Sequence, residues 1–310
     1  CSLLDESPAA AEAATMMHGL RTRDQQKSGA NVLFVDEEIF PQNLAVIQTR
    51  ALPQGMKIQV GNYKELVFTP EIFACILQYP NASGSVEDYR EFVEKAHAAH
   101  CKVAVDADIM SLALLVPPGE WGADIVFGST QRLGIPLFYG GPSAAYFATR
   151  DEYKRNMPGR IIGWSKDKYG KLAYRMALQT REQHIKREKA TSNICTAQAL
   201  LATMAGFYAV YHGQEGIKNI AKRIHSITTW LNKALTRLGY VQHNELFFDT
   251  LRFSLPDHVS AQKLRTIELS KEENLRYYDN GDVGFSIDET TDLKDVNLLL
   301  SIFSIAAEET

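Results

Sequence analysis

Short apolar runs alternate with longer amphipathic stretches through the first half of the chain. Branched and aromatic residues dominate the apolar runs, and turn residues bound them, so the runs predict strands. These strands are expected at 32–35, 57–60, 73–80, 102–106, 123–128 and 144–148. Helices are expected at 5–21, at 40–47 and after a capping box of Ser85 and Asp88. Strands that are apolar throughout are buried on both faces, so this alternation predicts an α/β fold around a mainly parallel sheet.

The second half of the chain has a different pattern. A polar, basic helix is predicted at 176–189, and the uncharged break Thr191-Ser192-Asn193 follows it. The remaining predicted elements are helices at 196–211 and 217–238, a strand at 250–255, a helix at 261–269, a strand at 283–287 and a helix at 293–307. This order predicts a large domain over 1–200 and a smaller C-terminal α+β domain over 201–310. We place the boundary region at 198–215, within a helix.

Composition narrows the class of protein. The 310 residues are 45% hydrophobic, and the net charge is 33 − 37 = −4, which argues against a nucleic-acid partner. No apolar run approaches the roughly 18 residues of a membrane helix, so we expect a soluble protein with no membrane partner. The scattered cysteines favour a reducing compartment, and no His or Cys pair has the spacing of a metal site. The chain begins at Cys1 without an initiator Met and looks like part of a longer one.

The predicted layout is similar to that of the aspartate-aminotransferase-type pyridoxal-phosphate enzymes. Such a site needs an acid at the pyridine nitrogen, a phosphate cup at a helix start and a lysine that forms a Schiff base. Asp106 ends a predicted strand and could be the acid, or it could be a helix cap or a sheet-end hydrogen-bonding group. Gln131, close after Ser129, stands where the lysine is expected, and glutamine cannot form an imine. Residues 7–11 also lack the glycines or serines of a phosphate cup.

Several stretches of the sequence are characteristic of one family. They are Ser2-Leu3-Leu4-Asp5-Glu6, Gly122-Ala123-Asp124-Ile125-Val126, Tyr139-Gly140-Gly141-Pro142, Met157-Pro158-Gly159-Arg160 and the long block over 177–198, which includes Arg187-Glu188-Lys189-Ala190-Thr191-Ser192-Asn193-Ile194-Cys195. Over essentially its whole length the chain resembles the N-terminal half of the P-proteins of the glycine cleavage system, the glycine dehydrogenases (decarboxylating).

This resemblance implies a division of labour. The complete enzyme decarboxylates glycine on pyridoxal phosphate, bound by the C-terminal half, and passes the aminomethyl group to the lipoyl arm of H-protein. The N-terminal half would lack catalytic residues and cofactor, keep only a remnant pocket of Asp106, Ser129 and Gln131, and be inactive alone. The expected partners are the C-terminal half or subunit, H-protein and a second copy in a dimer. The expected location is the bacterial cytoplasm, or the mitochondrial matrix if the source is eukaryotic.

Two groups of residues are candidates for the interface with a partner or for a substrate channel. The first is basic and comprises Arg181, His184, Lys186 and Arg187, which could instead form a solvated helix face with pairs such as Glu182–Lys186. The second comprises Thr191, Ser192 and Asn193, which could instead cap the helix predicted to start near Ile194.

Two other functions stay open at this point. One is a non-catalytic module that binds a small molecule in the degenerate pocket of Asp106 and Gln131. The other is a free-standing pyridoxal enzyme that uses a different lysine, such as Lys154, Lys166, Lys168 or Lys171. These lysines lie in polar stretches, whereas a nucleophilic lysine requires desolvation.

Overall fold

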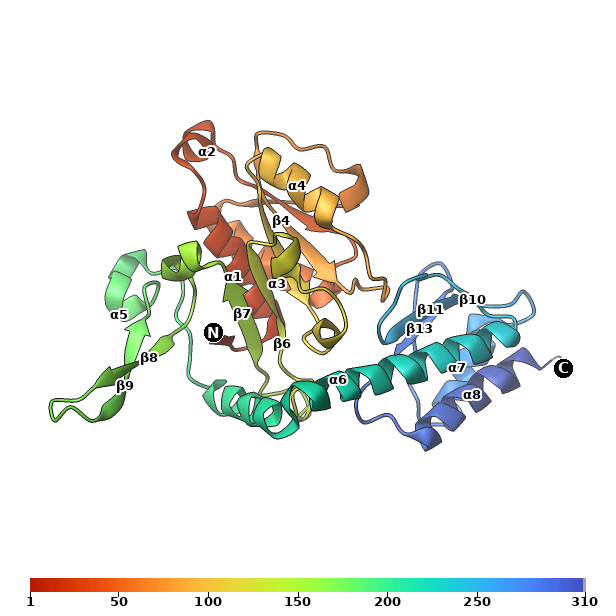
Figure 1. Cartoon of the computed structure of the whole chain (residues 1–310). Coiled ribbons are helices and arrows are strands. Elements are labelled where there is room, and N and C mark those ends of the chain that lie inside the picture. Colours follow the sequence, from red (N-terminus) through yellow and green to blue (C-terminus); the bar gives the residue numbers. More distant parts are fainter. Residues whose placement is uncertain (309–310) are drawn as a thin grey trace. The chain divides into compact units, whose positions relative to one another are not determined.

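A computed structural model describes residues 1–308, which form two compact units (Figure 1). The first unit comprises Cys1–Tyr79 and Asp88–Tyr211. The second comprises Pro80–Glu87 and the chain from His212 onward. Pro80–Glu87, which lies within the large domain predicted over 1–200, belongs to the second unit.

The first unit is built on a seven-stranded sheet in the order β1-β7-β6-β5-β4-β2-β3. The strands are β1 (Ser2–Leu3), β2 (Val32–Asp36), β3 (Lys57–Gly61), β4 (Ile72–Tyr79), β5 (Lys102–Ala107), β6 (Ile125–Ser129) and β7 (Ala145–Thr149). Strands β3, β2, β4, β5 and β6 pair in parallel, whereas β7 is antiparallel to β6 and to β1. Every residue of β4 is buried, as its apolar sequence predicts for a central strand. The predicted mainly parallel α/β fold is confirmed.

Short helices and 3-10 turns connect the strands of the first unit and continue beyond them. They are α1 (Glu6–Gly19), α2 (Arg23–Ser28), α3 (Pro41–Ala51), α4 (Arg90–Ala98) and α5 (Gln183–Lys186), with 3-10 turns at Leu52–Gln54, Tyr63–Glu65, Ser111–Ala113, Pro118–Trp121, Asp151–Asn156 and Arg187–Lys189. Helix α1 is rich in alanine, which lets it pack closely against α3 and across strands β4 to β7. Buried residues of these elements form one apolar core. The core holds the N-terminus of α1 at the carboxyl ends of the strands.

The long helix α6 (Ala199–Arg237) is interrupted at Gly213, whose φ of 62° and ψ of −179° are not helical. Glycine adopts this conformation without a steric penalty. The break falls between the two predicted helices. The chain passes from the first unit to the second at Tyr211, just before it.

The second unit contains a four-stranded antiparallel sheet in the order β10-β11-β13-β12. Its elements are β10 (Val241–Gln242), β11 (Thr250–Ser254), α7 (Ala261–Ser270), β12 (Arg276–Tyr277), β13 (Val283–Ser286) and α8 (Leu293–Ala307). Tyr240, Phe253, Phe285 and Phe303 pack as successive aromatic pairs inside it. The predicted α+β character of this part of the chain is confirmed.

Two local predictions are wrong. Helix α4 begins after Tyr89 with no side-chain cap, because Ser85 instead forms a bridge with Phe247 in the second unit. The continuous helix predicted at 176–189 is wrong as well, since only the short helix α5 (Gln183–Lys186) and the 3-10 turn Arg187–Lys189 form within this range. The first residues of that range, 176–178, belong instead to a hairpin of β8 (Ile161–Lys166) and β9 (Leu172–Leu178). This hairpin projects from the first unit in Figure 1.

Candidate functional site

Asp106 lies at the carboxyl end of β5 and is only 1% exposed. Its Oδ2 accepts a hydrogen bond from Asn43 Nδ2 at 2.5 Å. The same Asn43 nitrogen donates to Glu6 Oε1 at 2.9 Å, and Ser7 Oγ donates to Asn43 Oδ1. The start of α1 and the first turn of α3 therefore close over the carboxylate that the sequence assigned to a pyridine nitrogen.

This enclosure changes the chemistry of the acid. Burial, followed by the neighbouring Glu6, raises the pKa of Asp106 well above its usual value. A raised pKa favours the neutral acid, whereas a pyridinium partner needs the carboxylate. The second oxygen, Oδ1, is buried without a hydrogen-bond partner among the described residues, and the whole side chain is 1% exposed.

Ser129 and Gln131 lie at the end of the neighbouring strand β6 and just beyond it. Both are half-buried, and Ser129 Oγ accepts from the backbone N–H of Gln131 at 3.1 Å. Before them, a methyl group at Gly128 would lie 2.2 Å from the carbonyl oxygen of Ala107. Tyr146 packs against the same point, with its hydroxyl donating to that oxygen at 2.7 Å. The ends of the neighbouring strands β5 and β6 are thus in close contact at this point.

The second group of candidates gathers around Glu12, a residue of α1 that is 2% exposed. Arg181 donates to Glu12 Oε2 at 2.8 Å, and Ser192 Oγ donates to the same oxygen. Arg181 Nε also donates to Thr191 Oγ1 at 2.9 Å. Burial lowers the pKa of Arg181, while the carboxylate of Glu12 acts in the opposite direction. Three of the predicted interface residues therefore share one polar cluster, in which Arg181 and Ser192 are buried and Thr191 is exposed.

A cavity of about 320 Å³ adjoins this cluster. It is lined by Arg50, Gln183, Arg187, Ala190, Thr191, Ser192 and Asn193. Arg50 donates its Nη2 to Glu12 Oε1 at 2.9 Å and so connects the cavity to the cluster. His184 and Lys186 are exposed and do not line this cavity, and His184 Nε2 contacts Gln179 Oε1 at 2.6 Å instead.

The alternative roles of these residues are also resolved in part. Thr191, Ser192 and Asn193 do not cap a helix at Ile194, because α6 starts only at Ala199. The predicted Glu182–Lys186 pair is wrong, since the buried Glu182 carboxylate lies 3.6 Å from Arg160 and accepts from the Ile194 N–H. The segment is a loop anchored by buried carboxylates.

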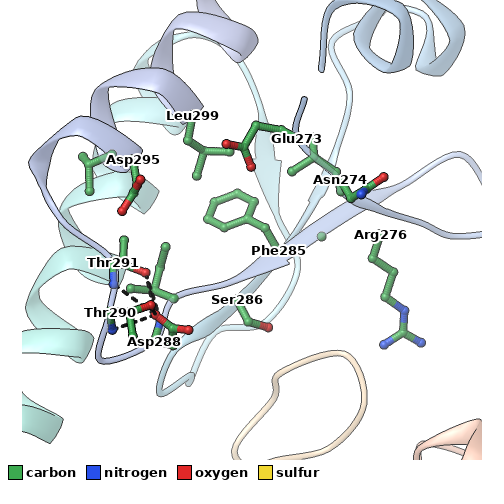
Figure 2. Close-up of a pocket in the computed structure, with 14 residues that line it drawn as sticks. Glu273, Asn274, Arg276, Phe285, Ser286, Asp288, Thr290, Thr291, Asp295 and Leu299 are labelled. Carbon is green, nitrogen blue, oxygen red and sulfur yellow. Dashed lines mark hydrogen bonds between the residues drawn. The ribbon is translucent and has the colours of Figure 1, made fainter. Parts of the chain in front are cut away.

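Figure 2 shows a cavity of about 500 Å³ in the second unit, lined by residues of β13, α8 and the segment before β12. Two of its acids serve the start of α8. Asp288 Oδ1 accepts from the backbone and hydroxyl groups of Thr290 and Thr291, and Asp295 Oδ2 accepts from the Asp292 N–H. Asp288 and Asp295 are therefore engaged by the helix cap.

The described part of the chain has neither a metal-binding cluster nor a membrane-spanning helix. Residues 1–308 contain no group of three or more His, Cys, Asp or Glu side chains placed to hold a metal ion. Within the same residues, no helix has the length and apolar composition of a membrane span.

Sequence reasoning missed Glu12, Asn43 and Arg50, which organise both clusters. A glutamate inside the alanine-rich stretch of α1 is the one local signal, because a charge on a helix that is otherwise small and apolar requires a partner. Nothing in the sequence near Asn43 indicates that it meets Asp106, 63 positions away.

Solved structures share this fold. A crystal structure of glycine decarboxylase (P-protein) of the glycine cleavage system, in inhibitor-bound form, superposes with a TM-score of 0.86 at 28% identity over 98% of this chain and 70% of that one. The cysteine desulfurase CsdA from Escherichia coli gives a TM-score of 0.67 at 15% identity, which shows the fold alone. The fold class of this chain is therefore that of the fold-type-I pyridoxal-phosphate enzymes.

The family follows from the sequence comparisons. The model of the glycine cleavage system P-protein family matches residues 1–303, so the chain belongs to that family. Glycine dehydrogenase (decarboxylating) of Bacteroides thetaiotaomicron is 78% identical over 307 residues, and that of Flavobacterium johnsoniae is 54% identical over 305. These matches cover 99% and 98% of this chain but 32% of each relative. The chain spans about a third of the length of the curated relatives it matches.

Proposed function

We propose that this chain is the N-terminal, lysine-free part of a glycine dehydrogenase (decarboxylating) and acts only together with the remainder of that enzyme. In the complete enzyme, pyridoxal phosphate bound by the C-terminal half supplies the decarboxylation of glycine. The aminomethyl group then passes to the lipoyl arm of H-protein. The 78% identity to a relative three times as long supports this assignment. As all the similar relatives named above are bacterial, we place the protein in the cytoplasm.

The observation that carries the proposal is the closed site around Asp106. An active pyridoxal site requires an ionised acid beside an open ring-sized space and a lysine opposite it. Here Asn43 and Ser7 occupy the acid's surroundings, and Gln131 stands at the lysine position. The residues present do not fit the cofactor, so we assign it to the other half. The same closure argues against a small-molecule module in this pocket.

A surface for the partner is available on the hairpin. Cross-strand pairs place Ile162 with Met176, Trp164 with Tyr174 and Lys166 with Leu172 on one side, which we call the outer hairpin face. Trp164 and Tyr174 are 73% and 72% exposed. A two-stranded hairpin is at best marginally stable by itself, and contiguous exposed apolar side chains mark interaction sites. We assign the outer hairpin face to contact with the rest of the enzyme, either within one chain or across a dimer.

The cluster around Glu12 supports the second part of the interface. Arg181, Thr191 and Ser192 are held rigidly there, while His184, Lys186, Arg187 and Asn193 remain exposed beside them. A rigid base with exposed cations is suited to orient a channel or a docking surface for a carrier. We assign these seven residues to that role.

Recombination of the two parts tests the proposal. This chain and the remaining C-terminal part of the Bacteroides thetaiotaomicron relative are prepared separately and assayed for release of carbon dioxide from glycine with lipoylated H-protein. Each part alone is expected to be inactive, and the mixture active. Activity of this chain alone, or equal activity of the C-terminal part with and without it, would refute the proposal.

A further inference from the structure

The cavity beside Glu12 has a composition that selects for anions. Its lining side chains are two arginines, two amides, two hydroxyls and one alanine, with no carboxylate among them. Guanidinium, amide and hydroxyl groups are donors suited to phosphate and carboxylate oxygens. The volume of about 320 Å³ is at the lower end of the range of small-molecule sites.

Arg187, which lines the cavity, has no side-chain hydrogen bond or ion pair within the described residues. The Arg187 side chain makes no hydrogen bond or ion pair with any residue in 1–308, although its neighbours Arg181 and Arg50 both bind Glu12. Its backbone has φ of 53° and ψ of −125°, a strained conformation for a residue with a Cβ. Strained, unpaired residues of this kind are concentrated at binding sites.

Free donor capacity remains on the other lining residues as well. Arg50 uses Nη2 to bind Glu12, which leaves its other N–H groups available. Thr191 Oγ1 accepts from Arg181 and therefore still has its own proton to donate. Ser192 is different, since its hydroxyl proton is directed to Glu12. The cluster thus fixes Arg50 and Thr191, which line the cavity together with Arg187.

The charges also sum in favour of an anion. The buried carboxylate of Glu12 is matched by Arg50 and Arg181, and that of Glu182 lies 3.6 Å from Arg160, which makes three cations for two anions. Arg187 adds a fourth cation, and no acid lines the cavity. A bound oxyanion would relieve this local excess of positive charge, and two guanidinium groups could each bind it in bidentate geometry.

We propose that this cavity is a binding site for a small oxyanion, a phosphate or a carboxylate, held between Arg50 and Arg187 with Thr191 as a further donor. The inference goes beyond the proposed function and does not rest on it. The site is formed within the first unit, so its occupancy is measurable on this chain without any enzyme activity.

Isothermal titration of the full chain with inorganic phosphate and, separately, with acetate at constant ionic strength tests the site. Saturable binding of one equivalent is expected, and the anion that binds more tightly identifies the class. R187Q is expected to weaken binding at least tenfold, whereas R187K, which keeps the charge but not the planar fork, weakens it less. The matched control is K189Q, which removes the same charge two residues away from an exposed side chain that does not line the cavity.

Less than a twofold effect of K189Q would support a built site. Equal weakening by R187Q and K189Q would show general charge attraction and overturn the proposal, as would non-saturable heats with both anions. Circular dichroism of each variant confirms that the fold is retained. Because the Arg187 side chain has no hydrogen-bond or ion-pair partner within residues 1–308, R187Q removes no such contact there.

Discussion

Arg181 and Glu12 form a nearly fully buried ion pair, with Nη2 and Oε2 2.8 Å apart although 169 positions separate the residues in the chain. The pair joins the alanine-rich helix α1 to the loop after the hairpin. That loop carries the most characteristic block of the family resemblance. The contact therefore explains how a charged segment with only short helical turns is held in one place.

Removing this pair should destabilise the fold. R181M keeps a similar length but leaves Glu12 buried with only Arg50 and Ser192, and we expect a loss of about 2–3 kcal/mol in the free energy of unfolding. Urea denaturation measures it. The control is K95M, which breaks an exposed pair with Glu91 and should have little effect. A loss with R181M no larger than with K95M would contradict the structural role.

The contact between β5 and β6 predicts a second effect. In G128A the new methyl group would meet the Ala107 carbonyl at 2.2 Å, and backbone cannot move aside as a flexible side chain can. We expect a loss of at least about 2 kcal/mol in the free energy of unfolding. G119A is the matched control, because a methyl group there has nothing within 4 Å. Comparable melting temperatures for the two variants would disprove the close approach.

Asp36, at the carboxyl end of β2, predicts a pH dependence. Burial, and then the charge of Glu38, raises its pKa from 3.8 to about 6 in the folded protein. The folded state thus binds the proton more tightly, so the contribution of Asp36 to stability is fully present below about pH 4 and declines as the pH rises through 6. D36N should therefore gain stability relative to the wild type between pH 4 and 7.

Urea midpoints measured across this range test the Asp36 prediction. The exposed Glu71 provides the control variant E71Q, whose difference from the wild type should stay nearly constant over the same window. A D36N difference that is flat with pH, or that falls as the pH rises, would be inconsistent with a buried carboxyl group.

The outer hairpin face predicts an effect on association alone. W164D places a charge on an exposed apolar surface, so the isolated chain should keep its stability, while the apparent Kd for the C-terminal part should rise at least tenfold. Analytical ultracentrifugation of mixtures measures this. R175Q, on the opposite side of the same hairpin, should bind as the wild type does. Unchanged association of W164D would remove the outer hairpin face from the interface.

Elements governed by local patterns could be predicted from the sequence. Strand β4 was expected at 73–80 and is observed at Ile72–Tyr79, because a short, continuous apolar run between turn residues is typical of a buried strand. The helices after residue 260 were found for the same reason, since each buries one apolar stripe.

Elements that depend on partners distant in the chain could not be predicted from the sequence. The residues 181–189 have charges at helical spacing, yet Arg181 and Glu182 bind Glu12 and Arg160 in buried pairs, and these contacts override local propensity. The same limit applies to the site. That residue 131 is glutamine and not lysine could be read from the sequence, but the closure of Asp106 by Asn43 depends on a contact between the end of β5 and the first turn of α3.

The most direct measurement concerns the imine. The full chain is incubated with excess pyridoxal phosphate, reduced with borohydride, digested and analysed by mass spectrometry, with a lysine-containing C-terminal part of a relative as positive control. The account predicts only scattered, substoichiometric labelling of surface lysines and no absorbance band of an internal aldimine. One equivalent of pyridoxyl label on a single lysine of this chain would contradict it.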